Sequence, residues 1–171
     1  HYFCIDFANP KTFVNLLGHS FDFIFILAAD LSGLGKTEIK YEYLRSNTTD
    51  YGNFLNFLAQ HKLVKKIIYI SSMTVYNADN LSPVSEEAKT TNPPNIYGLS
   101  KRIGEQLTAF FCYKNGVKGI SLRIPGLFGG DRRSGYLFNA IQKISMNQEF
   151  QINTQGLIYW ECASVIDIVE M

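Results

Sequence analysis

Short apolar runs of strand length alternate along the chain with longer segments in which apolar residues recur every three or four positions. The apolar runs cover residues 2–5, 21–27, 67–70 and 119–124, and the periodic segments cover residues 11–17, 38–61, 93–115 and 136–146. Run 21–27 is apolar at every position but Asp22, which predicts a strand buried on both faces. The alternation of strands and helices predicts an α/β fold with a parallel sheet and helices on both faces.

The clearest helical pattern lies in residues 93–115. Asn92 is placed to cap this helix, with Pro93 at its first position and Gly116 after its end. A stripe at steps of three and four predicts the face that packs into the core, namely Ile96, Leu99, Ile103, Leu107, Phe110 and Lys114. Residues 73–91 and the glycine-rich residues 125–135 predict loops. Strand-like pieces follow at 150–152 and 157–160, and a last helix begins near Ser164.

Composition narrows the class of protein. A chain of 171 residues with 46% hydrophobic and 18% charged residues fits one globular domain. The net charge of +1 without a basic run makes nucleic acid an unexpected partner, and no apolar run is long enough to span a membrane. Three widely spaced cysteines, Cys4, Cys112 and Cys162, indicate a reducing, cytoplasmic compartment rather than a disulfide framework. They share no metal-ligand spacing with the three histidines, so no metal site is expected. The start at His1 and the stop inside a helix-like run suggest a piece of a longer protein.

Candidate chemistry begins with Tyr97 and Lys101, which lie four residues apart on the predicted helix and so share one face. An ammonium beside a phenol favours the phenolate, which would let the tyrosine accept a proton nearer neutral pH. A solvated pair on a helix surface has the same spacing. Ala28-Ala29 and Ser71-Ser72 stand at the ends of two predicted strands, and residues 123–130 follow a third. Ligands of open parallel sheets bind beyond such carboxyl ends.

In this order and at these spacings, the chain resembles the extended short-chain dehydrogenase/reductase family, and more narrowly its NAD-dependent epimerase/dehydratases that act on nucleotide sugars. Residues 97–101 match the family's Tyr-Gly-x-Ser-Lys, and residues 71–76 resemble its Ser-Ser-x-x-Val-Tyr strand end. Weaker matches run from one end of the chain to the other: Asp6, residues 26–29, Asn47, the spacer of Pro83, Glu86 and Pro94, Leu122-Arg123, and Val165 with Asp167.

The resemblance implies roles for particular residues. Tyr97 would be the general base and acid, Lys101 would hold the nicotinamide ribose, and Ser72 would hold the reacting sugar oxygen. The cofactor, NAD or NADP, would lie against a set of further residues: Asp6, Ala28, Ala29, Asn47, Ser71 and Pro125. A nucleotide-sugar substrate would meet Thr74, Gly126, Arg132 and Arg133. Plainer interpretations remain open, in which Asp6 forms a turn, the alanines allow close helix packing, the serines end a strand, Asn47 braces strand ends and the arginines are solvated.

The resemblance also implies a Rossmann-like, doubly wound parallel sheet and a homodimer formed through the two long helices. The aromatic residues Phe54, Phe57, Phe110 and Phe111 fit such an interface or a larger core. The family's opening strand with its Gly-x-x-Gly-x-x-Gly turn, which holds the cofactor pyrophosphate, has no counterpart here. Residues 1–171 would therefore be a partial dinucleotide-binding domain, with the substrate-binding region starting at about residue 125.

Departures from the family pattern keep rival functions open. Ile26, Asp50, Tyr51 and Asn77 replace family residues, which leaves room for a degenerate binding protein without catalysis. A carbonyl reductase of the same family is a second alternative. Met73-Thr74 stand where 4,6-dehydratases carry Asp-Glu, which favours an epimerase or reductase over a dehydratase.

Overall fold

The computed structural model describes residues 2–77, 84–88, 90–151 and 161–171. The chain divides into two compact units. The first unit comprises His1–Asn80 and Val84–Arg123, and the second comprises Leu81–Pro83 and Ile124–Met171. The predicted strand pieces at 152 and 157–160, and Pro83 of the spacer, lie outside the described residues.

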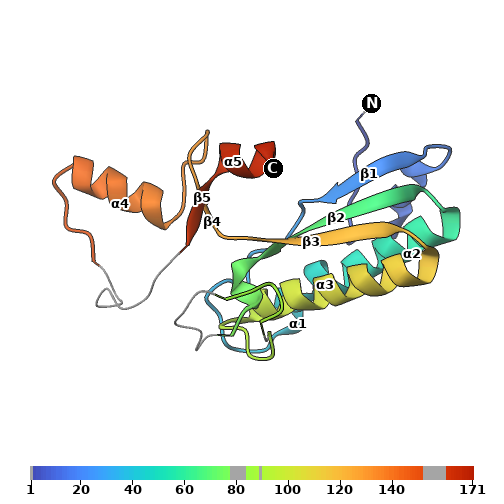
Figure 1. Ribbon diagram of the computed structural model, residues 1–171, viewed down its shortest axis with the longest axis horizontal. Helices are drawn as coiled ribbons and strands as arrows, with labels where there is room; N and C mark the ends of the chain where they lie inside the picture. The colour runs from blue at the N-terminus through green and yellow to red at the C-terminus, as the bar shows by residue number, and fades with distance from the viewer. Residues whose placement is uncertain (1, 78–83, 89, 152–160) are drawn as a thin grey trace. The chain divides into compact units, whose positions relative to one another are not determined.

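The first unit is built on a three-stranded sheet in the order β1-β2-β3 (Figure 1). The strands are β1 (Phe21–Ile26), β2 (Val64–Ser72) and β3 (Lys118–Ile124). β1 and β2 run parallel, with Phe21 opposite Val64 and Ile26 opposite Tyr69. The predicted α/β fold with a parallel sheet is confirmed. β2 is longer than the run 67–70 predicts, because Lys65 and Lys66 can extend the strand with their side chains in solvent.

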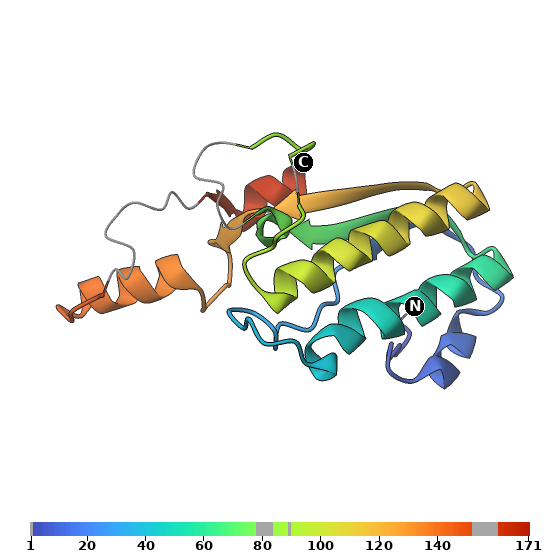
Figure 2. The same cartoon turned by 90° about the horizontal axis from the view of Figure 1, so that it is seen from below.

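The helical elements of the first unit lie along one side of this sheet (Figure 2). They are η1 (Pro10–Leu16), α1 (Tyr41–Arg45), η2 (Ser46–Asp50), α2 (Tyr51–His61) and α3 (Ile96–Asn115), with the short turn η3 (Met73–Val75) after β2. The predicted helix 38–61 begins three residues later than expected and is interrupted by η2, one turn of π-helix. Such insertions are frequent at functional sites.

The predicted cap of α3 is wrong. The N-cap is Asn95, whose side-chain oxygen accepts a hydrogen bond from the Gly98 backbone N–H at 2.9 Å. Pro94 explains the difference, since a residue that precedes proline is pushed out of the helical region, and Pro93 precedes Pro94. The predicted end is confirmed, because Gly116 adopts a left-handed φ of 65° as the C-cap.

The buried face of α3 also differs from the predicted stripe. Within the stripe Ile96 is buried, but Leu99, Ile103 and Leu107 are half-buried and Phe110 is 63% exposed. The buried residues are mostly small or polar, namely Ile96, Gly98, Ser100, Lys101, Gly104, Thr108 and Phe111. Small side chains let this helix approach β2 closely, which an apolar periodicity does not detect.

The core under the sheet is aromatic. Phe13, Tyr51, Phe54, Tyr69 and Phe111 are each at most 5% exposed. Tyr51 and Tyr69 stack with their ring centroids 5.3 Å apart, and Phe13 meets Phe54 edge-on at 5.3 Å. Phe54 and Phe111 are therefore core residues, and of the four aromatics proposed for an interface only Phe110 is largely exposed.

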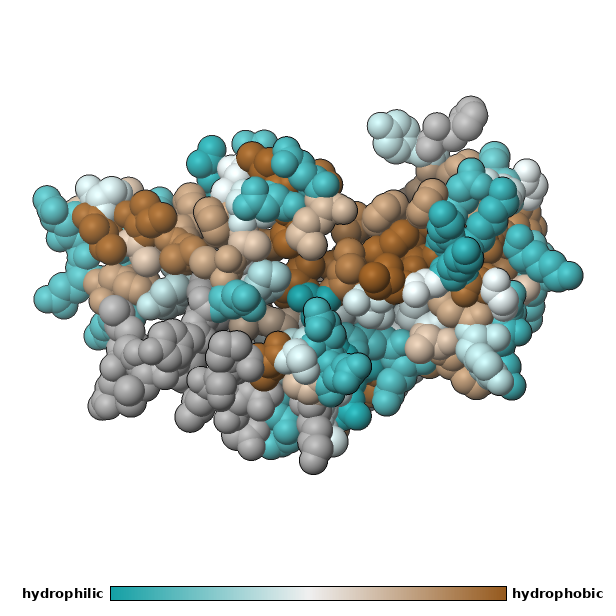
Figure 3. All heavy atoms as spheres, viewed as in Figure 1, coloured by the Kyte–Doolittle hydropathy of each residue, from teal (hydrophilic) through white to brown (hydrophobic). Residues whose placement is uncertain are grey.

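The opposite face of the sheet is open in this chain, contrary to the strand buried on both faces that run 21–27 predicts. Phe23 is 51% exposed, Phe25 60% and Ile120 54%. Figure 3 shows apolar side chains gathered over this part of the molecule. The run 2–5 is also not a strand, since these residues pair with none of the described strands.

The second unit contains a two-stranded parallel sheet of β4 (Gly126–Phe128) and β5 (Cys162–Ser164). Its helices are α4 (Tyr136–Ser145) and α5 (Val165–Glu170), and the Ser164 side chain caps α5 by accepting from the Ile166 N–H at 3.1 Å. β4 lies inside the predicted loop 125–135, because its partner strand is remote in sequence: Gly126 pairs with Cys162. Residues 150–151 form no strand.

Candidate active site

Ser72, the last residue of strand β2, is hydrogen-bonded to Thr74 in the turn η3. The Ser72 oxygen accepts from the Thr74 backbone N–H at 3.2 Å and from the Thr74 hydroxyl at 2.9 Å. These bonds turn the chain sharply into η3 and fix the Ser72 side chain. Because both bonds use lone pairs of the Ser72 oxygen, the serine proton remains available for a further acceptor.

The first turn of α3 lies directly against this strand end. A Cβ built on Gly98 would come within 2.1 Å of the Thr74 carbonyl oxygen, so only glycine fits there. Tyr97 precedes Gly98, and its backbone N–H donates to the Gly33 carbonyl at 3.3 Å. The fold thus brings Ser72, Thr74 and the start of α3, with Tyr97, to one edge of the sheet.

Lys101 lies one turn further along α3 and is buried, with 2% exposure. Its ammonium nitrogen stands 4.2 Å from the centroid of the Tyr69 ring, a cation–π arrangement. Within the described residues the ammonium donates no hydrogen bond. Burial lowers the pKa of Lys101 to about 8, and the negative charge of Glu105 opposes that shift. A nearly buried ammonium with free donors is suited to bind the hydroxyls or oxyanions of a ligand.

Tyr97 is half-buried, and burial raises the pKa of its phenol. The lowered pKa that the Tyr97–Lys101 spacing suggests is therefore wrong for the chain by itself. Burial takes the phenolate out of water and so disfavours its charge, which is the cause of the raised pKa.

Asn47 holds the neighbouring elements together. Its side-chain oxygen accepts from the Asp30 N–H at 2.7 Å, and its amide donates to the Asp30 carbonyl at 2.8 Å and to the Ser100 hydroxyl at 2.9 Å. Ser100 in turn donates to the Tyr97 carbonyl at 2.8 Å. Both amide protons of Asn47 are used inside the protein, so the side chain links the loop after β1 to α3.

The remaining predicted residues of the first unit have diverse surroundings. Asp6 is exposed, and its carboxylate accepts from the Ala8 N–H at 2.9 Å, which is the geometry of a turn. Ala28 and Ala29 are exposed just after β1. Ser71 is 2% exposed, and its hydroxyl has no hydrogen-bond partner among the described residues.

Four predicted residues, Pro125, Gly126, Arg132 and Arg133, belong to the second unit. Pro125 and Gly126 are half-buried, and the Gly126 N–H donates to the Glu161 carbonyl at 3.1 Å. Arg132 and Arg133 are exposed, and Arg132 donates to the Ser134 carbonyl at 3.1 Å.

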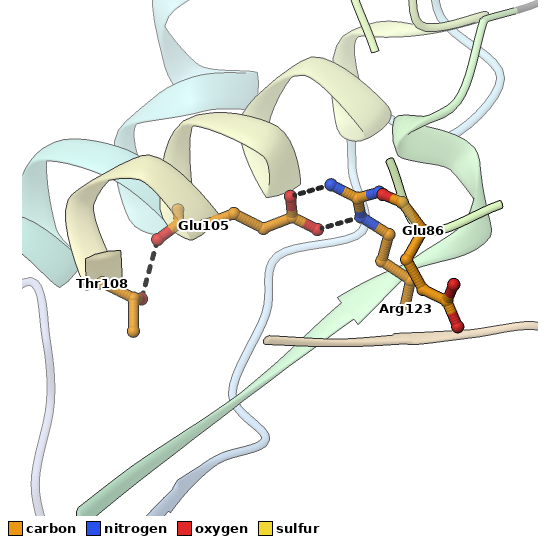
Figure 4. Close-up of polar contacts among 5 residues, drawn as sticks. Glu86, Glu105, Thr108 and Arg123 are labelled. Atoms are coloured by element: carbon orange, nitrogen blue, oxygen red, sulfur yellow. Dashed lines mark hydrogen bonds and ion pairs between the residues drawn. The ribbon is translucent and has the colours of Figure 1, made fainter. Parts of the chain in front are cut away.

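The sequence did not predict the ion pair of Glu105 and Arg123 near Lys101. Glu105 follows Lys101 by four residues, and its carboxylate receives two hydrogen bonds from Arg123, at 2.9 and 2.8 Å (Figure 4). The spacing of Tyr97, Lys101 and Glu105 at steps of four was a visible signal for Glu105. No local pattern indicates that Arg123, from the end of β3, reaches it.

No three His, Cys, Asp or Glu side chains in the described ranges are grouped so as to hold a metal ion. None of the described helices is both long and apolar enough to cross a membrane. Cys4, Cys112 and Cys162 are all free thiols.

Comparisons with known proteins show a matching protein family and several similar proteins. A model of the NAD dependent epimerase/dehydratase family matches residues 2–171. An uncharacterized protein of Methanocaldococcus jannaschii is 25% identical over 97% of this chain and 51% of its own length. UDP-glucuronate 4-epimerase 4 of Arabidopsis thaliana is 27% identical over 88% of this chain and 36% of its own length.

The crystal structure of UDP-glucuronic acid 4-epimerase from Bacillus cereus, in complex with UDP-glucuronic acid and NAD, aligns with a TM-score of 0.78. That enzyme is 21% identical, and the alignment covers 96% of this chain and 52% of the enzyme. The chain spans about half the length, or less, of these relatives.

Proposed function

Because the chain belongs to the NAD dependent epimerase/dehydratase family, we propose that it forms part of an enzyme that moves hydride between a nicotinamide cofactor and a sugar carbon of a nucleotide sugar. The observation that carries this proposal is the buried Lys101 ammonium, which donates no hydrogen bond to a described residue and lies one turn after Tyr97. Relatives named as UDP-glucuronate epimerases support the substrate class.

In this proposal Tyr97 takes the proton from a sugar hydroxyl and later returns it. Ser72 donates its remaining proton toward the same sugar oxygen and keeps it in place. Lys101 offers its ammonium protons to the ribose hydroxyls of the cofactor. When bound, the cofactor supplies the hydride acceptor and donor. A ligand oxygen next to Lys101 would stabilise the ammonium, which would then favour the Tyr97 phenolate.

The residues of this chain suit the nicotinamide end of the proposed cofactor but not its pyrophosphate. Lys101 and Tyr97 suit the nicotinamide ribose, and the exposed Ala28 and Ala29 leave the end of β1 open to a ligand. The Gly-x-x-Gly-x-x-Gly turn that holds a pyrophosphate is not in the sequence. We therefore propose that this chain is a segment of a longer protein, with the substrate region starting at about residue 125, close to the boundary of the second unit.

We also propose a homodimer formed through α2 and α3. The half-buried stripe of α3, from Leu99 to the 63% exposed Phe110, supports it. An apolar stripe that the chain itself covers only in part is typical of a helix that packs on a second subunit.

The test uses the longest natural form of the protein. We expect calorimetry to detect binding of NAD(H) or NADP(H), and Lys101→Met to abolish it. Lys114→Met changes an exposed lysine of the same helix and should leave binding intact. Turnover of UDP-sugars should fall by about 10² to 10⁴-fold in Tyr97→Phe, the usual contribution of a general base. Tyr113→Phe, at an 82% exposed position, is its matched control.

The outcomes separate the proposed enzyme from its alternatives. Cofactor binding without turnover of any nucleotide sugar would favour the carbonyl reductase. Failure to bind either cofactor would favour a binding protein without catalysis and would remove the role given to Tyr97.

A further inference from the structure

The Arg123–Glu105 pair is the best-formed ion pair near the candidate site. Arg123 Nε and Nη2 donate to the two carboxylate oxygens of Glu105 at 2.9 and 2.8 Å, a bidentate arrangement (Figure 4). The side chains are only 22% and 11% exposed, so water competes weakly for these bonds. The pair raises the pKa of Arg123 above its already high ordinary value.

Arg123 is held by three partners. Besides its two bonds to Glu105, its Nη1 donates to the Glu86 carbonyl at 2.8 Å, and the guanidinium carbon lies 4.9 Å from the Tyr76 ring centroid. A planar guanidinium can serve all these partners at once, whereas an ammonium cannot. The carboxylate of Glu105 is thereby fixed toward the end of β3.

A second cation, Lys101, lies near Glu105 on the same helix. Lys101 precedes it by four residues, and side chains at this spacing are neighbours on a helix surface. The Lys101 ammonium nonetheless lies over Tyr69 and donates no hydrogen bond to a described residue. Arg123 engages both oxygens of the Glu105 carboxylate and holds that carboxylate in their bidentate pair.

We propose that Arg123 is a positioning residue for Lys101: by holding Glu105 in a bidentate pair, it keeps this carboxylate from capturing the Lys101 ammonium and leaves the ammonium for a ligand oxygen. The inference concerns the state of Lys101 in the chain and rests on the proposed function only for the identity of the ligand, the cofactor ribose. Burial lowers the pKa of Lys101 to about 8, and the Glu105 charge opposes that shift only in part.

Other titratable groups belong to the elements packed around Lys101. Tyr69 of β2 lies beneath the ammonium, Tyr97 shares α3, and Tyr51 of α2 stacks on Tyr69. Burial raises the pKa values of all three phenols, so they remain neutral where Lys101 titrates. Asp50 of η2 is already paired with Arg45 at 3.2 Å. Glu105 is therefore the carboxylate whose position controls Lys101.

The test measures the pKa of Lys101 without any cofactor, by NMR titration of the chain labelled with ¹³C at lysine Cε. The Lys101→Met spectrum assigns the signal. Arg123→Gln should release Glu105 and raise the pKa of Lys101 by about one unit or more, as expected when an opposite charge comes within reach. Arg123→Lys, which can hold only one carboxylate oxygen well, should raise it by less and covers the case in which Arg123→Gln does not fold.

A double variant separates release of Glu105 from simple loss of a nearby positive charge. In Arg123→Gln/Glu105→Gln the pKa of Lys101 should return to its value in Glu105→Gln alone. An unchanged pKa in the Arg123 variants, or a rise that persists in the double variant, overturns the inference. Cofactor affinity of the longest natural form should fall at least tenfold in Arg123→Gln and recover in the double variant. If the pKa shifts as expected but no cofactor binds, the proposed function fails and the positioning role stands.

Discussion

Gly104 provides the sharpest test of how α3 is seated on β2. A Cβ at this position would lie 2.0 Å from the Tyr69 hydroxyl oxygen, whereas ordinary contacts begin at about 3.4 Å. In Gly104→Ala the phenol would have to retreat by more than an ångström. Tyr69 is 2% exposed, stacks on Tyr51 and lies under Lys101, so it has little room to move.

The magnitude follows from two opposing contributions. Alanine in a helix interior is favoured over glycine by up to about 1 kcal/mol. Overpacking a rigid core costs about 1–3 kcal/mol, and the immobile ring places this site near the upper end. We therefore expect Gly104→Ala to lower the free energy of unfolding by about 2 kcal/mol, measured by urea denaturation followed by circular dichroism.

Gly52→Ala is the matched control. Gly52 lies in α2, and its Cβ would meet only Leu107 at 3.9 Å, an ordinary contact. This variant should gain about 0.5–1 kcal/mol from helix propensity. If both variants are stabilised alike, α3 does not approach β2 as closely as described, and the burial of Lys101 is refuted with it.

Three further predictions concern Lys101, Asn47 and Phe110. The folded pKa of Lys101, about 8, lies below the usual 10.5, so its cost of about 3 kcal/mol is complete below pH 8 and fades as the pH rises to 10.5. Lys101→Met should accordingly be more stable than the parent at pH 7. This difference in the free energy of unfolding, measured by urea titration at each pH, should be smaller at pH 10. Asn47→Ala should lose about 2 kcal/mol, because it strands the Asp30 backbone groups and the Ser100 hydroxyl, whereas Asn53→Ala at an exposed position of α2 should be near neutral. Phe110→Ser should raise the dimer dissociation constant at least tenfold in sedimentation experiments, and a variant dimer as tight as the parent would exclude the α3 stripe as the interface.

Apolar runs and strand-end motifs predicted much of the fold. Runs 21–27, 67–70 and 119–124 are strands, and the family model confirms the resemblance drawn from residues 71–76 and 97–101. Burial was harder to predict. An apolar strand has the same sequence pattern whether or not its second face is covered within the chain. The exposure of Phe23 and Phe25 could therefore not be predicted from the pattern.

The site was only partly predictable for a related reason. Tyr97, Lys101 and Ser72 stand in a recognisable motif. The depth of Lys101, however, depends on Gly98 and Gly104, which put no side chain between α3 and its neighbours Thr74 of η3 and Tyr69 of β2. Hydrophobic periodicity assigns such residues no weight, so it selected the stripe from Leu99 to Phe110 as the core face. The long-range partner of Glu105 comes from β3 and has no local signal at all.

These features connect stability to function. Close packing of Gly98 on Thr74 and of Gly104 on Tyr69 draws α3 onto η3 and β2 and buries Lys101, whose ammonium destabilises the folded chain. Pairing with Glu105 would relieve that cost, yet Arg123 holds both carboxylate oxygens. An arrangement that withholds the nearest counter-ion from a buried cation is unfavourable for folding alone. It is what a binding group requires, since the acceptor that relieves the ammonium must then come from the ligand.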